Sequence, residues 1–154
     1  MSLVIANYDP DWPSHAAREA AEVGAVDGVR QVEHVGSTAV PGLAARPTID
    51  LLVGVDDPDA LAADAFEPLG YREDAGGAGR SFWKGTRAFH TYELLVVVRG
   101  GAEWDRRLAL RDRLRDEADL AEEYAHRKRE LARAHADDPG AYAEAKAALV
   151  DALT

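Results

Sequence analysis

The sequence predicts an α+β fold in which a β-sheet is followed by a helical C-terminal third. Apolar runs at 29–35 (VRQVEHV) and 49–55 (IDLLVGV), and a second pair at 81–84 and 91–98, have the character of strands. After Arg99-Gly100-Gly101 the pattern changes to helical periodicity and stays helical. A chain of 154 residues is long enough to bury one core without disulfides, so we expect a single domain over residues 1–154.

Composition excludes several classes of function. The chain has no cysteine, which rules out disulfides, cysteine nucleophiles and thiolate metal sites and favours a cytoplasmic protein. No secretory leader pattern and no apolar stretch of membrane-spanning length is visible, so no membrane partner is expected. The formal net charge of −10 argues against binding to nucleic-acid backbones. A small-molecule partner is expected instead, and the oligomeric state stays open.

The N-terminal half is predicted to alternate strands and helices. Residues 2–8 (SLVIANY) are typical of a short strand. The turn at 9–13 (DPDWP) starts a helix that ends near 24–28, with Trp12 as a packed anchor or, alternatively, a stacking platform for a nucleobase. In the strand at 29–35, His34 shares a face with Arg30 and Val32, opposite Glu33 and Val35.

Further elements follow from turn and capping signals. Ile49 to Val55 is nearly all apolar, as expected of a strand covered on both faces. Asp57-Pro58 predicts a helix reaching about Leu69, and the loop at 76–79 (GGAG) is interpreted as a hinge or lid. The strands at 81–84 and 91–98 are joined around Gly85. Three helices follow, over 103–115, from Asp119 with a capping box to Glu122, and from Asp138-Pro139.

The corner between the first two apolar runs carries the candidate chemistry. Gly36 lets the backbone turn tightly, so that its amides and the hydroxyls of Ser37 and Thr38 can hold phosphate oxygens. Asp50 follows within a strand of apolar neighbours, where a carboxylate needs a cation or hydrogen bonds. Asp50 therefore takes part in a metal or phosphate site, or alternatively it caps a loop amide or pairs with Arg46.

The segment EHVGSTAVPGLAARPTIDLLV at 33–53 resembles the signature of the GrpB family, whose fold is similar to that of the polymerase-beta-type nucleotidyltransferases. The resemblance extends to YDPDWP, to 82–85 (FWKG), to 108–114 with its Arg111-Asp112 pair, and to the pairs Tyr124/Lys128 and Tyr142/Lys146. It implies a nucleotidyltransferase-like mixed β-sheet with flanking helices.

The resemblance also implies a Mg²⁺-dependent reaction on a nucleoside triphosphate. In that superfamily a Gly-Ser pair precedes an Asp-x-Asp pair and a third acid, which together bind two Mg²⁺ ions. Gly36, Ser37 and Asp50 match this scheme, Leu52 stands at the second acid position, and Glu93 is the candidate third acid. Asp50 and Glu93 are therefore the predicted metal ligands, enough for one ion. The His-x-His pair typical of relatives is incomplete here: the strand reads Glu93-Leu94-Leu95 or, with a shifted alignment, His90 and Tyr92.

Other polar side chains are candidates for the same pocket. His34 precedes the Gly-Ser turn and is predicted to carry a proton or contact phosphate, or alternatively to bond a carbonyl at the strand end. Cations at Arg46, Arg80, Lys84 and Arg87 are candidates for phosphate binding, with a surface location as the alternative. Lys128 and Lys146 are predicted to cover the open side of the pocket, although amphipathic packing explains them equally well.

Two functional hypotheses follow. The first is a Mg²⁺-dependent nucleotidyltransferase that uses a nucleoside triphosphate donor and a small-molecule acceptor, with Asp50, Glu93 and His34 as catalytic residues. The second is a non-catalytic nucleotide- or metabolite-binding module on a degenerate nucleotidyltransferase fold, which Leu52 favours. A nucleic-acid enzyme fits the acidic charge balance poorly.

Overall fold

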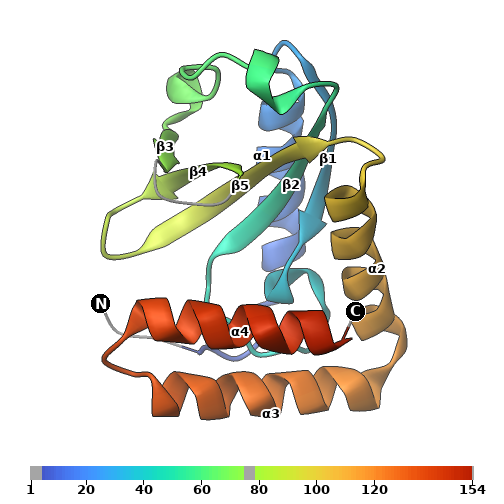
Figure 1. The fold of residues 1–154 in the computed structure, drawn as a ribbon, viewed down its shortest axis with the longest axis vertical. Coiled ribbons are helices and arrows are strands. Elements are labelled where there is room, and N and C mark those ends of the chain that lie inside the picture. Colours follow the sequence, from blue (N-terminus) through green and yellow to red (C-terminus); the bar gives the residue numbers. More distant parts are fainter. Residues whose placement is uncertain (1–4, 75–78, 154) are drawn as a thin grey trace.

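A computed structural model describes residues 5–74 and 79–153 and confirms the α+β fold with a mixed sheet, flanking helices and a helical C-terminal third (Figure 1). The described elements are α1 (Trp12–Gly24), β1 (Val29–Val35), the short 3-10 helix η1 (Ser37–Ala39), β2 (Ile49–Val55), the 3-10 helices η2 (Pro58–Ala60) and η3 (Glu67–Leu69), β3 (Arg72–Asp74), β4 (Arg80–Gly85), β5 (His90–Val98), α2 (Ala102–Asp116), α3 (Ala118–Ala134) and α4 (Pro139–Leu153).

The five strands form one sheet in the order β1-β2-β5-β4-β3. β2 and β5 are parallel, and the other neighbouring pairs are antiparallel. The register aligns Val35, Asp50, Glu93 and Trp83 across four strands. Because residues opposite one another in neighbouring strands point to the same face, these four side chains form one row on one face of the sheet.

The two faces of the sheet are covered by different helices, as Figure 1 shows. α1 packs on one face, where Leu51, Val53 and Phe82 belong to the main hydrophobic core. On the other face, Trp104 of α2 packs with Val35 and Leu52 in a smaller cluster. α3 and α4 lie side by side across one end of the sheet, close to η1 (Figure 1). β2 is thus covered on both faces, as its apolar sequence predicts.

The helix predicted from Asp57-Pro58 to Leu69 is wrong. The capping signal itself is real, because the Asp57 side chain accepts a hydrogen bond of 2.9 Å from the amide of Asp59, but only the short helix η2 follows. Leu61 and Phe66 are both buried. Five residues apart, they would point about 140° away from each other around an α-helix. Breaking the segment into turns and two 3-10 helices brings both side chains into the core.

The remaining smaller predictions meet different outcomes. Asp119 does not cap a helix: α3 begins at Ala118, and its N-cap residue Glu117 makes no side-chain capping bond. In the described part of the predicted N-terminal strand, Ala6 forms an isolated bridge with Ala45. Trp12 is buried in the main core and meets Tyr8 edge to face at 5.5 Å, as predicted for a packed anchor. Residues 75–78 of the predicted hinge lie outside the described residues.

Over residues 5–74 and 79–153, none of the helices combines the length and the apolar character needed to cross a lipid bilayer.

Candidate functional site

The carboxylate of Asp50 lies against the turn that follows β1. Gly36 has φ +76° and ψ −175°, and a β-carbon at this position would lie 2.5 Å from Oδ2 of Asp50. Only glycine combines a left-handed φ with space for the carboxylate to approach this closely. Asp50 is partly exposed, and its carboxylate forms no hydrogen bond or ion pair with any residue that the structure describes. The alternative that Asp50 pairs with Arg46 or caps a loop amide is therefore wrong.

Glu93 lies next to Asp50 on the neighbouring parallel strand. Burial and the negative charge of Glu93 raise the pKa of Asp50 to about 6, while Lys146, Arg46 and Arg107 act in the opposite direction. Glu93 is oriented by His90, whose Nδ1 lies 2.8 Å from Oε1, and the His90 ring stacks on Trp83 at 4.4 Å. Neighbouring carboxylates repel each other, and such a like-charge pair is a common property of metal sites and acid–base sites.

Ser37 begins η1, one residue after Gly36, and is joined to a buried lysine of α3. Nζ of Lys128 donates a hydrogen bond of 2.6 Å to Oγ of Ser37. The Lys128 side chain runs past the Tyr124 ring, and only 1% of the residue is exposed. Burial, followed by the charge of Lys146, lowers the pKa of Lys128 well below its usual range.

Two further cations face the acids. Arg46, from the loop before β2, and Lys146, from α4, line a small cavity together with Ser37, Asp50 and Glu93. Neither cationic side chain forms a hydrogen bond or ion pair with the part of the chain that the structure describes. Burial disfavours the charge on Lys146, but Tyr124, Asp50 and Tyr142 outweigh it and raise its pKa. The hydroxyl of Tyr142 is buried and has no hydrogen-bond partner among the described residues.

The small cavity belongs to a larger depression. Three adjoining cavities of about 200, 250 and 50 Å³ share Asp50 and Glu93 in their walls. The 250 Å³ cavity is closed on one side by α2, which contributes Arg107 and Arg111. Arg107 was assigned no role in the site from the sequence, and this helix was not identified as a wall of the cavity. The available signal was the repeat of arginines four residues apart, at positions 107 and 111, which places both on one side of a helix.

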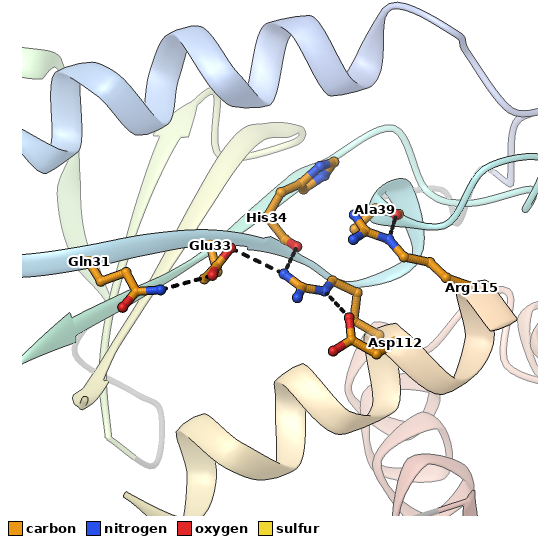
Figure 2. A network of polar contacts seen from close by, with 7 residues as sticks. Gln31, Glu33, His34, Ala39, Asp112 and Arg115 are labelled. Atoms are coloured by element: carbon orange, nitrogen blue, oxygen red, sulfur yellow. Dashed lines mark hydrogen bonds and ion pairs between the residues drawn. The ribbon is translucent and has the colours of Figure 1, made fainter. Parts of the chain in front are cut away.

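Figure 2 shows how α2 is held beside β1. Arg111 donates hydrogen bonds of 3.3 Å to Oε2 of Glu33 and to the His34 carbonyl, and it also contacts Asp112 at 2.9 Å. One helical turn later, Arg115 donates a hydrogen bond of 2.8 Å to the carbonyl of Ala39 in η1. These contacts fix the arginine-bearing wall relative to the Gly-Ser turn.

Comparison with known proteins gives the family. A model of the family described as "GrpB protein" matches residues 2–154. This chain belongs to the GrpB family. A GrpB-family crystal structure, described as "conserved protein GrpB from Enterococcus faecalis", superposes with a TM-score of 0.82 at 32% identity, covering 96% of this chain and 93% of that one.

Similar sequences occur in other bacteria. A "UPF0157 protein" of Halalkalibacterium halodurans is 38% identical over 99% of this chain and 80% of its own length. Another "UPF0157 protein", of Pseudomonas aeruginosa, is 43% identical over 90% of this chain. The match covers 60% of that relative, so this GrpB chain spans only part of its length.

The structure does not bring His34 to the cavity. His34 pairs in register with Leu51, so it lies on the face covered by α1, opposite to Asp50 (Figure 2). Its Nε2 lies 2.8 Å from Oγ1 of Thr38. Burial, with smaller effects from Arg115 and Arg111, lowers the pKa of His34 to about 4, which keeps the ring neutral. The prediction that His34 points into the pocket is wrong, because alternation along β1 turns it to the other face.

Two predicted phosphate-binding cations also lie elsewhere. Arg80 is bound to Glu73 at 2.9 Å and to the carbonyls of Pro58 and Leu61. Lys84 is paired with Glu19 at 2.5 Å. Both side chains stabilise the side of the molecule that carries α1. Arg87 is exposed in the turn between β4 and β5. Of the cations proposed from the sequence, the structure gathers Arg46, Lys128 and Lys146 around Ser37 and Asp50.

The acidic side chains offer a limited set of metal ligands. Among residues 5–74 and 79–153, no three or more His, Asp or Glu side chains are grouped so that they could hold a metal ion. Leu52, at the position of the second acid, is fully buried and packs with Val35 and Trp104. The two oxygen ligands Asp50 and Glu93 fit a hard cation such as Mg²⁺ only if water and a bound phosphate complete its coordination.

Proposed function

We propose that this GrpB-family chain binds a nucleoside triphosphate together with one Mg²⁺ ion at Asp50 and transfers its nucleotidyl group to a small-molecule acceptor. The observation that carries the proposal is a set of unpaired groups around one cavity. Asp50, Arg46 and Lys146, which all line this cavity, have no hydrogen-bond or ion-pair partner among the described residues. Such groups are costly unless a ligand of mixed charge completes them.

The two sides of the cavity suit the two parts of such a ligand. Arg46, Lys146 and the Ser37 hydroxyl supply the donors that phosphate oxygens need. Asp50 and Glu93 supply carboxylate oxygens for one Mg²⁺ ion, which when bound would polarise the phosphate that it contacts. Arg107 lies at the rim on α2, where its guanidinium is paired with Glu103 at 2.6 Å.

The pKa of Asp50, at about 6, gives the proposed activity a pH dependence. Below that pH the carboxyl is protonated and cannot ligate a cation. Above it the carboxylate is available, and the bound cation favours its ionised form. At limiting Mg²⁺ we therefore expect activity to fall as the pH drops below about 6, and saturating Mg²⁺ should move this fall to lower pH.

The experiment is release of pyrophosphate from ATP with Mg²⁺ and a panel of small hydroxyl and amine acceptors. Asp50→Asn and Glu93→Gln are expected to lower the rate by at least about a hundredfold. His34→Gln serves as the matched control because His34 lies on the opposite face of the sheet, and its rate should stay near that of the parent. Equal rates for Asp50→Asn and the parent protein would refute the proposal.

A second function is favoured by Leu52. Because this residue is buried against Trp104, the fold has no place for the second metal of a two-metal transferase at that position. A non-catalytic module that binds a nucleotide or phosphorylated metabolite is therefore the competing proposal. It predicts ligand binding at the same cavity with no pyrophosphate release for any acceptor.

A further inference from the structure

Lys128 and Ser37 form a contact that phosphate binding does not explain. Lysines that bind phosphate usually keep a hydrated, charged amine at the end of a mobile side chain. Lys128 is instead 1% exposed, and its Nζ lies 2.6 Å from Oγ of Ser37. Ser37 in turn lines the cavity that contains Asp50. A buried amine is therefore directed at a hydroxyl that faces the proposed substrate.

The charges around Lys128 make it a base. Lys146 on α4, Arg46 before β2 and Arg129 on α3 itself all disfavour a further positive charge. Asp50 on β2 favours that charge, but burial is the larger effect, and the pKa of Lys128 is lowered well below the usual lysine range. An uncharged amine accepts a hydrogen bond, so the same separation then lets the Ser37 hydroxyl donate to Nζ.

We propose that Ser37 and Lys128 form a serine–lysine pair in which Nζ of Lys128 removes the proton from Oγ of Ser37, and Oγ attacks the α-phosphorus of the nucleoside triphosphate. This inference rests on the proposed function, which it divides into two displacements. Pairs of serine and lysine serve as nucleophile and base in unrelated enzymes.

The reaction consists of two displacements at the α-phosphorus, and bonds and protons are conserved in each. In the first, the bond from Oγ to phosphorus forms and the bond from phosphorus to pyrophosphate breaks. Pyrophosphate leaves with the electron pair, and Lys128 keeps the serine proton as an ammonium group. In the second, the acceptor hydroxyl attacks the same phosphorus and the bond from Oγ breaks. Lys128 returns its proton to Ser37, and the acceptor proton passes to water. Arg46 and Lys146 neutralise the phosphoryl oxygens in both steps.

The first test looks for the covalent intermediate. The full chain is incubated with Mg²⁺ and ATP that is radiolabelled at the α-phosphate, without acceptor, and is then denatured. We expect up to one label per chain, mapped to Ser37, with an equal burst of pyrophosphate. Ser37→Ala and Lys128→Met should both lose the label. Continuous pyrophosphate release from an unlabelled protein would refute the pair while leaving the proposed function intact.

The second test needs no nucleotide. A fluorophosphonate probe reacts with activated serines: the bond from Oγ to phosphorus forms, fluoride leaves, and Lys128 takes the proton. Labelling of Ser37 should rise with pH to a plateau reached well below pH 10.5, the ordinary pKa of lysine. We expect Lys128→Arg to lower the rate at least about a hundredfold, because its guanidinium keeps the hydrogen bond but cannot accept a proton.

The Lys146→Met variant distinguishes a catalytic contact between Lys128 and Ser37 from a contact that serves packing alone. Lys146 lowers the pKa of Lys128, so this variant should move the midpoint of the labelling profile to higher pH. A contact that only holds α3 against η1 would give no such shift. Circular dichroism melting confirms that each variant is folded. If Ser37 in the folded parent protein stays unlabelled by both reagents at every pH, the proposal is wrong, whatever the protein does with ATP.

Discussion

The carboxylate of Asp50 lies so close to the α-carbon of Gly36 that a β-carbon there would stand 2.5 Å from Oδ2. The contact links the turn after β1 to the acid of β2, through the antiparallel pairing of Val35 with Asp50. It also places Ser37, the next residue, at the edge of the same cavity. The geometry of the whole site therefore depends on a glycine at position 36.

Replacement of Gly36 by alanine tests this dependence. Gly36→Ala meets both the unfavourable left-handed backbone conformation and the overlap with Asp50. We expect it to lower the free energy of unfolding by about 2–4 kcal/mol. Gly42→Ala is the matched control, because Gly42 has φ +80° but nothing within 4 Å of its added β-carbon. It should cost about 1 kcal/mol. Equal losses in urea denaturation would contradict the account.

The ionised carboxylate of Asp50 is expected to lower the free energy of unfolding at neutral pH. Its pKa is raised from 3.8 to about 6 on folding, so the folded state holds a proton that the unfolded state has lost between these values. The part of the stability that comes from protonated Asp50 is then lost progressively as the pH rises from 3.8 through 6. Asp50→Asn removes this loss.

The variant should therefore be more stable than the parent protein above pH 6, by at most about 3 kcal/mol, and should match it below pH 3.8. Urea denaturation without Mg²⁺, from pH 3.5 to about 8, measures the difference. An Asp50→Asn protein that is less stable at neutral pH would show that the carboxylate has a structural partner.

His34 produces the opposite pH dependence. Its pKa is lowered from 6.5 to about 4 on folding, so the unfolded state takes up a proton first. Stability is complete above pH 6.5 and is lost as the pH falls toward 4, by up to about 3 kcal/mol. His34→Gln should abolish this part of the acid sensitivity while keeping the contact to Thr38. If the loss of stability between pH 6.5 and 4 is unchanged in His34→Gln, His34 is not buried in its neutral form.

The part of the site that sequence predicts well is the part that is local. Gly36, Ser37 and Asp50 lie on consecutive elements, and the antiparallel pairing of β1 with β2 brings them together. Glu93 is a candidate only through the resemblance to the GrpB family, as the third acid of the superfamily scheme. The contact between Lys128 and Ser37 spans 91 residues, and no local pattern specifies which turn a helix 91 residues away will cover.

The errors have physical causes of the same kind. His34 was assigned to the pocket because it precedes Val35 and Gly36, yet one residue along a strand reverses the face. Arg80 and Lys84 were assigned by charge alone, and each is committed to an ion pair, with Glu73 and Glu19. The helix after Asp57 failed because burial of Leu61 and Phe66 outweighs a good capping signal. In each case tertiary packing decided between local alternatives.

The central claim, that Asp50 and Ser37 share one cavity for a metal and a phosphate, is tested most directly by calorimetric titration with ATP in the presence and absence of Mg²⁺. We expect binding at least about tenfold tighter with Mg²⁺, which is about 1.4 kcal/mol. Asp50→Asn should lose that difference, Lys146→Met should weaken binding in both conditions, and His34→Gln should match the parent protein. Absence of ATP binding, or affinity that depends on neither Mg²⁺ nor Asp50, would contradict the account.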